Sequence, residues 1–351
     1  MIAGEDRFLG ATFGLAYGDA IGFPALFHRF RVTPKKRHDF LWRTNMELYR
    51  QQINRVMLPY THRLPPAILE PSPTDDTEFA VLNLQALLRA SGEPTQQTFL
   101  AVWQEAVLPH ADAVASGFSE RAAIENLRRG LLPPETGNDN PLHYEDSAVP
   151  RAVPIGLFCV GDPDRAAALA QLDAEITQAE DGIYAARAMA AAVAVLAGGG
   201  ALAEATARAR AEFPADSWIA HMDGVARACR DAAETPEDLI LSLSAQVVNT
   251  VYSYGCVAPE TLPAALVIAE QCAGDLRAAC LAANALPKAA DSLPAFVGAL
   301  CGCFQGIGAI TPRWRAVLKV CRGVCLPFLE GADIEALTRQ LYAAARPAGP
   351  R

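Results

Sequence analysis

The stretch Ala185-Ala186-Arg187-Ala188-Met189-Ala190-Ala191-Ala192 decides the fold class of this chain of 351 residues. Alanine has the highest intrinsic helix propensity, and much of the 51% hydrophobic fraction of the sequence is alanine. No segment shows the sustained two-residue alternation, bounded by hairpin turns, that is typical of strands. We therefore predict an all-α fold built from packed helices.

Outward from this stretch, hydrophobic residues recur at helical spacing along most of the chain. The alanine-rich segment itself is predicted as a helix over residues 182–197, which ends at Gly198-Gly199-Gly200. The same pattern and its Gly or Pro stops predict further helices over residues 7–19, 77–90, 95–106, 119–129, 164–171, 202–212, 218–234, 236–251, 261–271, 275–284, 292–303, 312–321 and 334–345.

Two long irregular stretches, residues 23–71 and 131–154, interrupt the helical pattern. The sequence contains no repeat and no low-complexity linker, so we predict a single domain over residues 1–351 with a lid-like insertion at about residues 23–71. Long loops inside domains often serve as lids or binding loops. A plain surface elaboration is the alternative for this insertion.

The overall charge and the N-terminal sequence exclude some classes of function. A net charge of −9 argues against nucleic acid as a partner, because binding phosphates requires a basic face. The basic cluster at residues 29–38 is local, and either a solvated loop or a substrate phosphate explains it. Acids at the N-terminus argue against a signal peptide, and glycines interrupt the most apolar stretch, so we expect no membrane span and a cytoplasmic protein.

The segment Ser72-Pro73-Thr74-Asp75-Asp76-Thr77-Glu78 places hydroxyls and acids at the start of an apolar helix. Hard divalent cations prefer oxygen ligands, and one helical turn can supply several of them. Much later in the chain, Asp291-Ser292 precedes another apolar run in the same way. Together the two segments predict a metal site between two helices. Either segment alone is also explained as a helix cap.

Three further polar residues are candidates for substrate binding. Asp19 lies among glycines at four-residue spacing, which permit close helix contact, so a buried Asp19 requires a partner. A packing seam without a role in the site is the alternative for these glycines. Ser147 and Arg151 belong to a polar loop that leads into an apolar segment. Arg151 could pair with an aspartate, or bind a carboxylate or phosphate of a substrate in a forked geometry.

Taken in order, these segments resemble the ADP-ribosylglycohydrolase family, hydrolases that remove ADP-ribose from protein side chains. The family pattern has a Gly-Asp-Ala-x-Gly helix, a Ser/Thr-Asp-Asp-Thr motif, an Arg-x-x-Pro-Ile-Gly segment, an acidic closing motif, a Gly-Ala-Leu helix and a segment ending in Trp. The corresponding residues here are 18–22, 74–77, 151–156, 287–292, 298–300 and 310–314. The resemblance implies a single large orthogonal helical bundle of the ADP-ribosylglycohydrolase type.

The sequence also departs from the family pattern at several positions. Leu26 stands where the family usually has a glutamate, and Ala289 stands where the closing motif has its first aspartate. Glu145, Asp146 and Ser147 occupy a loop that usually carries glycines and asparagine. These departures bear on the metal site and on catalysis.

The resemblance implies two Mg²⁺ or Mn²⁺ ions that hold ribose hydroxyls and share the aspartates of the two motifs. Because Ala289 supplies no carboxylate, we expect one ion rather than two. Glu78 lies on the same helical face as Asp75 and is a possible substitute ligand. The residues carried over as metal ligands are Thr74, Asp75, Asp76, Asp291 and Ser292.

We therefore predict a metal-dependent hydrolase that cleaves an N- or O-glycosidic bond of an ADP-ribosyl, ribosyl or related small glycoside. Asp75 or Asp76 would act as ligand and base, and Glu145 or Asp146 as leaving-group acid. The expected partner is a small-molecule glycoside or an ADP-ribosylated substrate. The alternatives are a non-catalytic member that binds ADP-ribose, a nucleotide or a partner protein, and a different metal-assisted reaction on the same scaffold.

Overall fold

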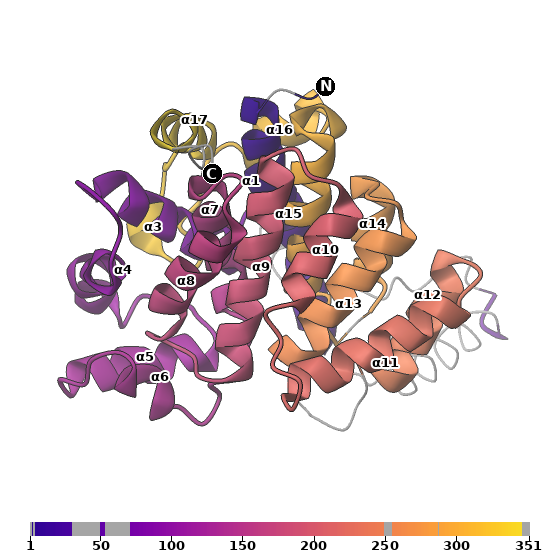
Figure 1. The fold of residues 1–351 in the computed structure, drawn as a ribbon, viewed down its shortest axis with the longest axis horizontal. Coiled ribbons are helices and arrows are strands. Elements are labelled where there is room, and N and C mark those ends of the chain that lie inside the picture. Colours follow the sequence, from indigo (N-terminus) through magenta and orange to yellow (C-terminus); the bar gives the residue numbers. More distant parts are fainter. Residues whose placement is uncertain are drawn as a thin grey trace.

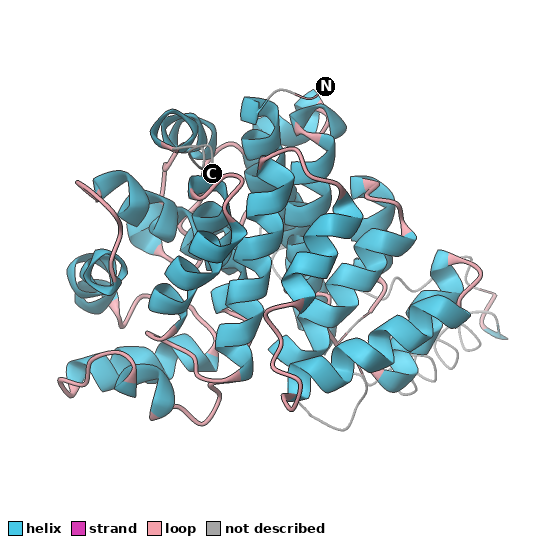
Figure 2. Ribbon diagram, viewed as in Figure 1, coloured by secondary structure: helices cyan, strands magenta, loops and turns pink. Residues whose placement is uncertain are grey.

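The computed structural model describes residues 2, 4–29, 50–52, 71–248, 255–286 and 288–345, with the helical backbone alone for residues 23–29. Helices joined by loops make up this part of the chain, which confirms the predicted all-α class (Figures 1 and 2). No strand forms among these residues. Extended segments pair there in two isolated bridges, Glu145 with Val257 and Val320 with Asp333.

The α-helices are α1 (Gly4–Arg29), α3 (Asp75–Arg89), α4 (Gln96–Val102), α5 (Phe118–Arg128), α6 (Glu135–Asn138), α7 (Ala148–Phe158), α8 (Pro163–Ala174), α9 (Asp181–Ala197), α10 (Leu202–Arg210), α11 (Trp218–Ala232), α12 (Pro236–Gln246), α13 (Ala258–Gln271), α14 (Leu276–Asn284), α15 (Leu293–Gln305), α16 (Pro312–Leu318) and α17 (Ile334–Ala344). A π-helical turn, η2 (Trp103–Val107), follows α4. Short 3₁₀ turns are η3 (Leu108–His110), η4 (Ile307–Ala309) and η5 (Pro327–Leu329).

The alanine-rich segment forms the centre of the bundle as helix α9. Its alanines between 185 and 192 are all buried, and α7, α8 and α10 pack around it (Figure 1). Small side chains allow this close approach: a Cβ at Gly156 of α7 would lie 2.5 Å from the carbonyl oxygen of Ala190. The composition that favours helix therefore also sets how tightly the helices pack.

Helix α1 packs antiparallel to α15 through a seam of glycines. A Cβ at Gly14 would lie 2.1 Å from the carbonyl oxygen of Gly298, and one at Gly22 would lie 2.2 Å from that of Ala290. No side chain tolerates such distances, so glycine is required along the seam. The seam confirms the packing interpretation of the glycine spacing. It also brings α1 beside the residues that precede α15.

Several predicted boundaries differ from the structure, among them the end of α8, at Ala174 rather than 171, and the end of α16, at Leu318 rather than 321. Helix α1 continues to Arg29 rather than ending at residue 19, because its glycines are held against α15. Helix α7 begins at Ala148, inside the stretch predicted as irregular, because Pro150 lies in its first turn, where a missing amide costs little. Helix α12 ends at Gln246 rather than 251. Most of the predicted insertion, residues 30–49 and 53–70, lies outside the described residues.

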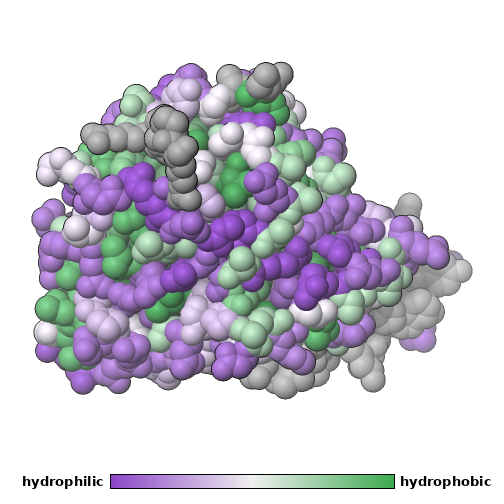
Figure 3. Space-filling model, viewed as in Figure 1, coloured by the Kyte–Doolittle hydropathy of each residue, from purple (hydrophilic) through white to green (hydrophobic). Residues whose placement is uncertain are grey.

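In the described part of the chain, no helix has both the length and the apolar character needed to cross a bilayer. Figure 3 shows one face of the molecule, on which hydrophilic residues cover most of the area and hydrophobic residues are scattered among them.

Candidate active site

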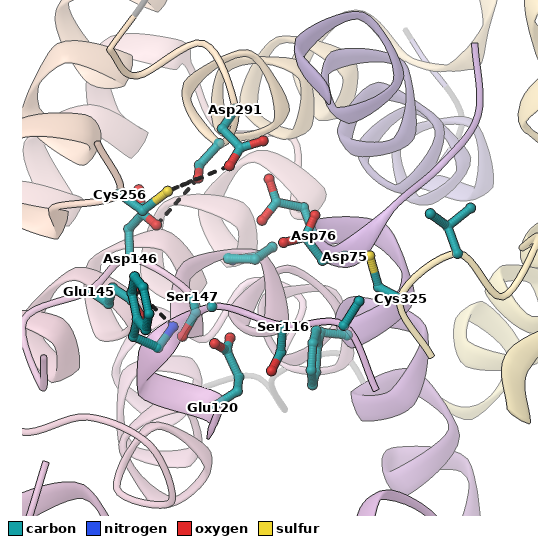
Figure 4. Close-up of a pocket in the computed structure, with 17 residues that line it drawn as sticks. Asp75, Asp76, Ser116, Glu120, Glu145, Asp146, Ser147, Cys256, Asp291 and Cys325 are labelled. Atoms are coloured by element: carbon teal, nitrogen blue, oxygen red, sulfur yellow. Dashed lines mark hydrogen bonds between the residues drawn. The ribbon is translucent and has the colours of Figure 1, made fainter. Parts of the chain in front are cut away.

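A cavity of about 420 Å³ forms where the start of α3, the loops before α5 and α7, and the start of α15 meet. The predicted residues Ser147 and Ser292 line it together with six acids. In Figure 4, Asp76 projects toward Asp291, with Asp146 and Cys256 on one flank and Glu120 below. No Lys, Arg or His occurs among the described lining residues. The six acids are Asp75, Asp76, Glu120, Glu145, Asp146 and Asp291.

Helix α3 is capped by a carboxylate from another helix. Asp19 of α1 accepts hydrogen bonds from the backbone amides of Thr74, at 2.7 Å, and Thr77, at 3.1 Å. The hydroxyls of both threonines also donate to Asp19. No side chain at the N-cap position, Thr74, caps the helix. The capping role predicted as an alternative for residues 72–78 thus belongs to Asp19, and Asp75 and Asp76 project into the cavity.

Asp19 and Thr74 themselves do not line the cavity. Each is 1% exposed, and the buried Thr74 hydroxyl donates a hydrogen bond to the buried Asp19 carboxylate. Burial raises the pKa of Asp19 to about 6, against the opposing effect of the hydrogen bonds from Thr74 and Thr77. Asp19 was expected to contact substrate, but its carboxylate contacts the start of α3 instead. The structure leaves Thr74, predicted as a metal ligand, outside the lining.

Glu78 holds the loop that forms another wall of the cavity. Its carboxylate accepts hydrogen bonds from the amides of Val324 (2.9 Å), Cys325 (2.9 Å) and Leu326 (2.6 Å), and the residue is fully buried. Val324 and Cys325 line the cavity. Glu78 is therefore committed to the loop and does not substitute for the missing aspartate at position 289.

The loop before α7 joins three parts of the site. Glu145 accepts hydrogen bonds from the first amides of α5, Phe118 at 3.3 Å and Ser119 at 2.6 Å. Asp146 accepts a bond of 3.3 Å from the Ser292 hydroxyl, which links this loop to the closing motif. The Ser147 hydroxyl accepts a bond of 2.7 Å from Gln178. The cavity walls are thus fixed by side chains that also face the cavity.

Arg151 was predicted to bind substrate, but the structure places its guanidinium in the core. The side chain is fully buried, pairs with Asp173 at 2.9 Å and donates to the Thr177 hydroxyl at 2.7 Å. It lies over the Trp103 ring and does not line the cavity. Its nearest link to the cavity is Glu120, at 4.0 Å. Arg151 therefore lies in the core next to the cavity and does not face it.

Glu120 and Cys256 line the cavity and carry no sequence motif. Glu120 lies in the first turn of α5, where an acid is favoured by the helix dipole, so its sequence context indicates only an ordinary surface helix. Cys256 lies beside the closing motif, with Sγ 3.6 Å from a carboxylate oxygen of Asp291 and 3.6 Å from the Ser292 hydroxyl. Only the tertiary fold brings either residue to the site.

The acids act as one electrostatic unit. Burial raises the pKa of Asp75 well above its usual value, and the charges of Asp291, Asp19 and Glu120 raise it further. Burial likewise raises the pKa of Asp76, followed by repulsion from Asp75 and other acids of the cavity. Like charges held close together in a poorly solvated site favour uptake of a proton or of a cation.

The donor atoms suit a hard divalent cation. Asp75, Asp76, Asp291 and Ser292 present only oxygen, and a cation would relieve the repulsion among the carboxylates. Across the residues that the structure describes, however, no three Asp, Glu, His or Cys side chains already converge in a metal-binding arrangement. Ala289 is 1% exposed in the hydrophobic core and adds no ligand. The residues fit a cation by their chemistry.

Comparisons with known proteins agree with the resemblance seen in the sequence. The model of the family described as ADP-ribosylglycohydrolase matches residues 2–351. A solved chain described as an ADP-ribosylglycohydrolase-related protein complex has a TM-score of 0.62 at 22% identity, covering 98% of this chain and 99% of that chain. This likeness shows the fold. No curated protein matches the sequence.

Proposed function

The chain belongs to the ADP-ribosylglycohydrolase family, and from that premise we propose that its acidic cavity hydrolyses an N- or O-glycosidic bond of an ADP-ribosyl, ribosyl or related small glycoside. The observation that carries the proposal is the meeting of Asp75 and Asp76 with Asp291 in one cavity, although the two segments are far apart in the sequence. Most glycosidases use two carboxylates that flank the scissile bond, and the acids that line this cavity support such a pair.

A divalent cation is part of this proposal. Asp75, Asp76, Asp291 and Ser292 would hold Mg²⁺ or Mn²⁺, with one ion expected rather than two because position 289 is alanine. When bound, such an ion orients vicinal hydroxyls of a sugar and lowers the pKa of a bound water.

The side chains of the cavity divide the proton transfers between them. Asp75 or Asp76 accepts the proton of the attacking water as the bond to the anomeric carbon forms. The leaving group takes a proton from the opposite wall as the glycosidic bond breaks. Asp146 is better placed for this role than Glu145, since both carboxylate oxygens of Glu145 already accept amides of α5.

The test replaces Asp75 or Asp76 with asparagine and measures both metal binding and release of free sugar. We expect sugar release from a panel of ribosyl and ADP-ribosyl glycosides in the presence of Mn²⁺ to fall by roughly 10²-fold or more. Calorimetric titration with Mn²⁺ should show weaker binding. Asp216→Asn, an exposed aspartate, is the matched control. Full activity in both site variants would rule the hydrolase out.

A non-catalytic role is the second candidate, and one observation favours it. Ala289 is buried and supplies no ligand atom at the position where the family pattern has an aspartate. Such a protein would bind ADP-ribose, a nucleotide or a partner without turnover. Ligand binding that needs no Mn²⁺ and releases no sugar would identify it. A different metal-assisted reaction on the same scaffold would show products other than the free sugar.

A further inference from the structure

We propose that the cavity selects uncharged glycosides with an aromatic aglycone, of which ribonucleosides are the model class, over glycosides that carry phosphate. The inference rests on the proposed function and specifies the substrate of the same site. Three features of the cavity support it: its charge, the state of its backbone amides and its apolar wall.

The charge of the cavity opposes a phosphate group. Six acids line it, and no basic side chain among the described residues does. One divalent cation would offset two of these charges, and the charge of Arg151, 4.0 Å from Glu120, is already paired with Asp173 at 2.9 Å. The remaining carboxylates face any ligand at short range in a poorly solvated space, where like charges repel strongly.

The backbone amides that usually bind phosphate are already taken. Helix N-termini are the common anion sites of proteins, and those of α3, α5, α7 and α15 border this cavity. At the starts of α7 and α15, Pro150 and Pro294 lack an amide hydrogen, and the amides of Val149 and Leu293 bond to backbone carbonyls. Asp19 occupies the start of α3, and Glu145 occupies the start of α5. Glu78 occupies three successive amides of the third wall, including that of Val324. At α3, α5 and residues 324–326, a phosphate would have to displace a protein carboxylate.

Part of the lining is apolar, and two of its side chains, Val324 and Phe118, are exposed. Phe79, Pro150 and Val324 contribute to it, and Phe118 is 59% exposed at the first position of α5. An accessible aromatic ring beside polar groups suits a ligand with one flat apolar part and one hydroxylated part. The cavity volume of about 420 Å³ lies toward the small end of ligand pockets. A ribose turned toward the acids with a base against Phe118 meets these conditions.

The test compares nucleosides with ligands that carry phosphate. Adenosine, inosine and uridine, their 5′-monophosphates and ADP-ribose are titrated by calorimetry in Mn²⁺ at low ionic strength and at about 1 M salt, where charges are screened beyond about 3 Å. We expect at least one nucleoside to bind about tenfold or more tightly than its monophosphate at low salt, and salt to narrow the difference. Tighter binding of the monophosphates or of ADP-ribose, or no nucleoside binding, overturns the inference.

Two variants test the electrostatic cause. Glu120→Gln removes one cavity charge, and Asp146→Asn removes the charge that Asp146 carries when it is deprotonated. We expect each to reduce the preference for nucleoside over monophosphate by about threefold or more. Glu125→Gln removes a charge from the exposed face of the same helix, α5, and should leave the preference unchanged. An unchanged preference in both cavity variants contradicts the inference.

The titrations also separate this inference from the proposed function. Nucleosides that bind without release of ribose leave the selectivity intact and remove the hydrolytic function. Faster sugar release from ADP-ribosyl substrates than from nucleosides supports the hydrolytic function and overturns the proposed selectivity.

Discussion

At the scale of single residues, the site is shaped by buried carboxylates that accept backbone amides from distant segments. Asp19 binds the start of α3, Glu145 the start of α5 and Glu78 the loop at residues 324–326. Each bond crosses between elements, so each acid fixes the position of one cavity wall relative to another. These three acids are positioning residues, and of them only Glu145 also lines the cavity, together with Asp75 and Asp76.

Replacing Glu78 with glutamine should loosen one wall of the cavity. The neutral amide offers one acceptor oxygen in place of two, and hydrogen bonds to a charged group each contribute about 1.5–3 kcal/mol. We expect the amides of Val324, Cys325 and Leu326 to exchange with solvent deuterium faster in Glu78→Gln, as measured by mass spectrometry of peptides from this loop. Glu330→Gln, exposed on the same loop, is the control. Equal exchange in both variants contradicts the role of Glu78.

Residue roles could be predicted from sequence where the side chain belongs to a motif, and not where the partner is remote. Asp75, Asp76 and Asp291 follow from their motifs and do meet in the cavity. Arg151 pairs with an aspartate, one of the two roles considered for it, but no motif marks its partner Asp173, so the sequence could not identify that residue. Glu120 reaches the cavity only because α5 is placed by its cap at Glu145. The metal roles of the predicted ligands stay a prediction.

At the scale of elements, the seam between α1 and α15 is the contact most sensitive to substitution. In Gly14→Ala the new methyl group would meet the carbonyl of Gly298 at 2.1 Å, so the helices must separate. We expect the free energy of unfolding to fall by about 3 kcal/mol or more, measured by urea denaturation.

Gly224 of α11 provides a matched control for this seam. A Cβ there meets nothing within 4 Å, so Gly224→Ala should gain about 0.5–1 kcal/mol from helix propensity alone. A Gly14→Ala variant as stable as the parent protein would show that the two helices can separate without loss of stability.

The four-residue spacing of the glycines predicts close contact, but the sequence does not identify α15 as the partner. A proline in the first turn of a helix resembles a loop residue in the sequence, so the start of α7 was not predicted.

At the scale of the whole molecule, ion pairs join helices that lie outside the site. Arg210 of α10 binds Glu270 of α13 at 2.6 Å and Asp223 of α11 at 2.9 Å, and Arg230 of α11 also pairs with Glu270. Burial alone would raise the pKa of Glu270, but its bonds to Arg210 and Arg230 outweigh burial and hold the pKa below its usual value.

The depressed pKa of Glu270 predicts a pH-dependent contribution to stability. A carboxyl with a lowered pKa in the folded state stabilises the fold above its unfolded pKa and loses this effect as pH falls through the folded value. Glu270→Gln should therefore be less stable than the parent protein by about 2 kcal/mol at neutral pH. The difference in unfolding free energy between the two proteins should disappear below pH 4.5, the usual pKa of a glutamate. Urea denaturation at neutral pH and below pH 4.5 measures this difference, and Glu204→Gln, at an exposed position, is the control. A gap independent of pH contradicts the assignment.

The fold class of the whole molecule follows from composition and period, because helix propensity and hydrophobic spacing act locally. The arrangement of the helices does not, since it depends on which faces meet. The single domain over residues 1–351 stays a prediction, as does the role of the insertion at residues 23–71. Leu26, where the family pattern has glutamate, lies in α1, and its side chain is outside the described residues.

The pairing of α1 with α15 has a consequence for how the protein is made. Arg7 and Cys303, which share a hydrogen bond, are 296 positions apart in the sequence. The ribosome therefore releases the first helix long before its partner, and contacts of such separation close late. Until α15 emerges, the glycine stripe of α1 has no surface to pack on, and Asp291 is not yet opposite Asp76. During synthesis the cavity is thus among the last parts of the molecule to exist.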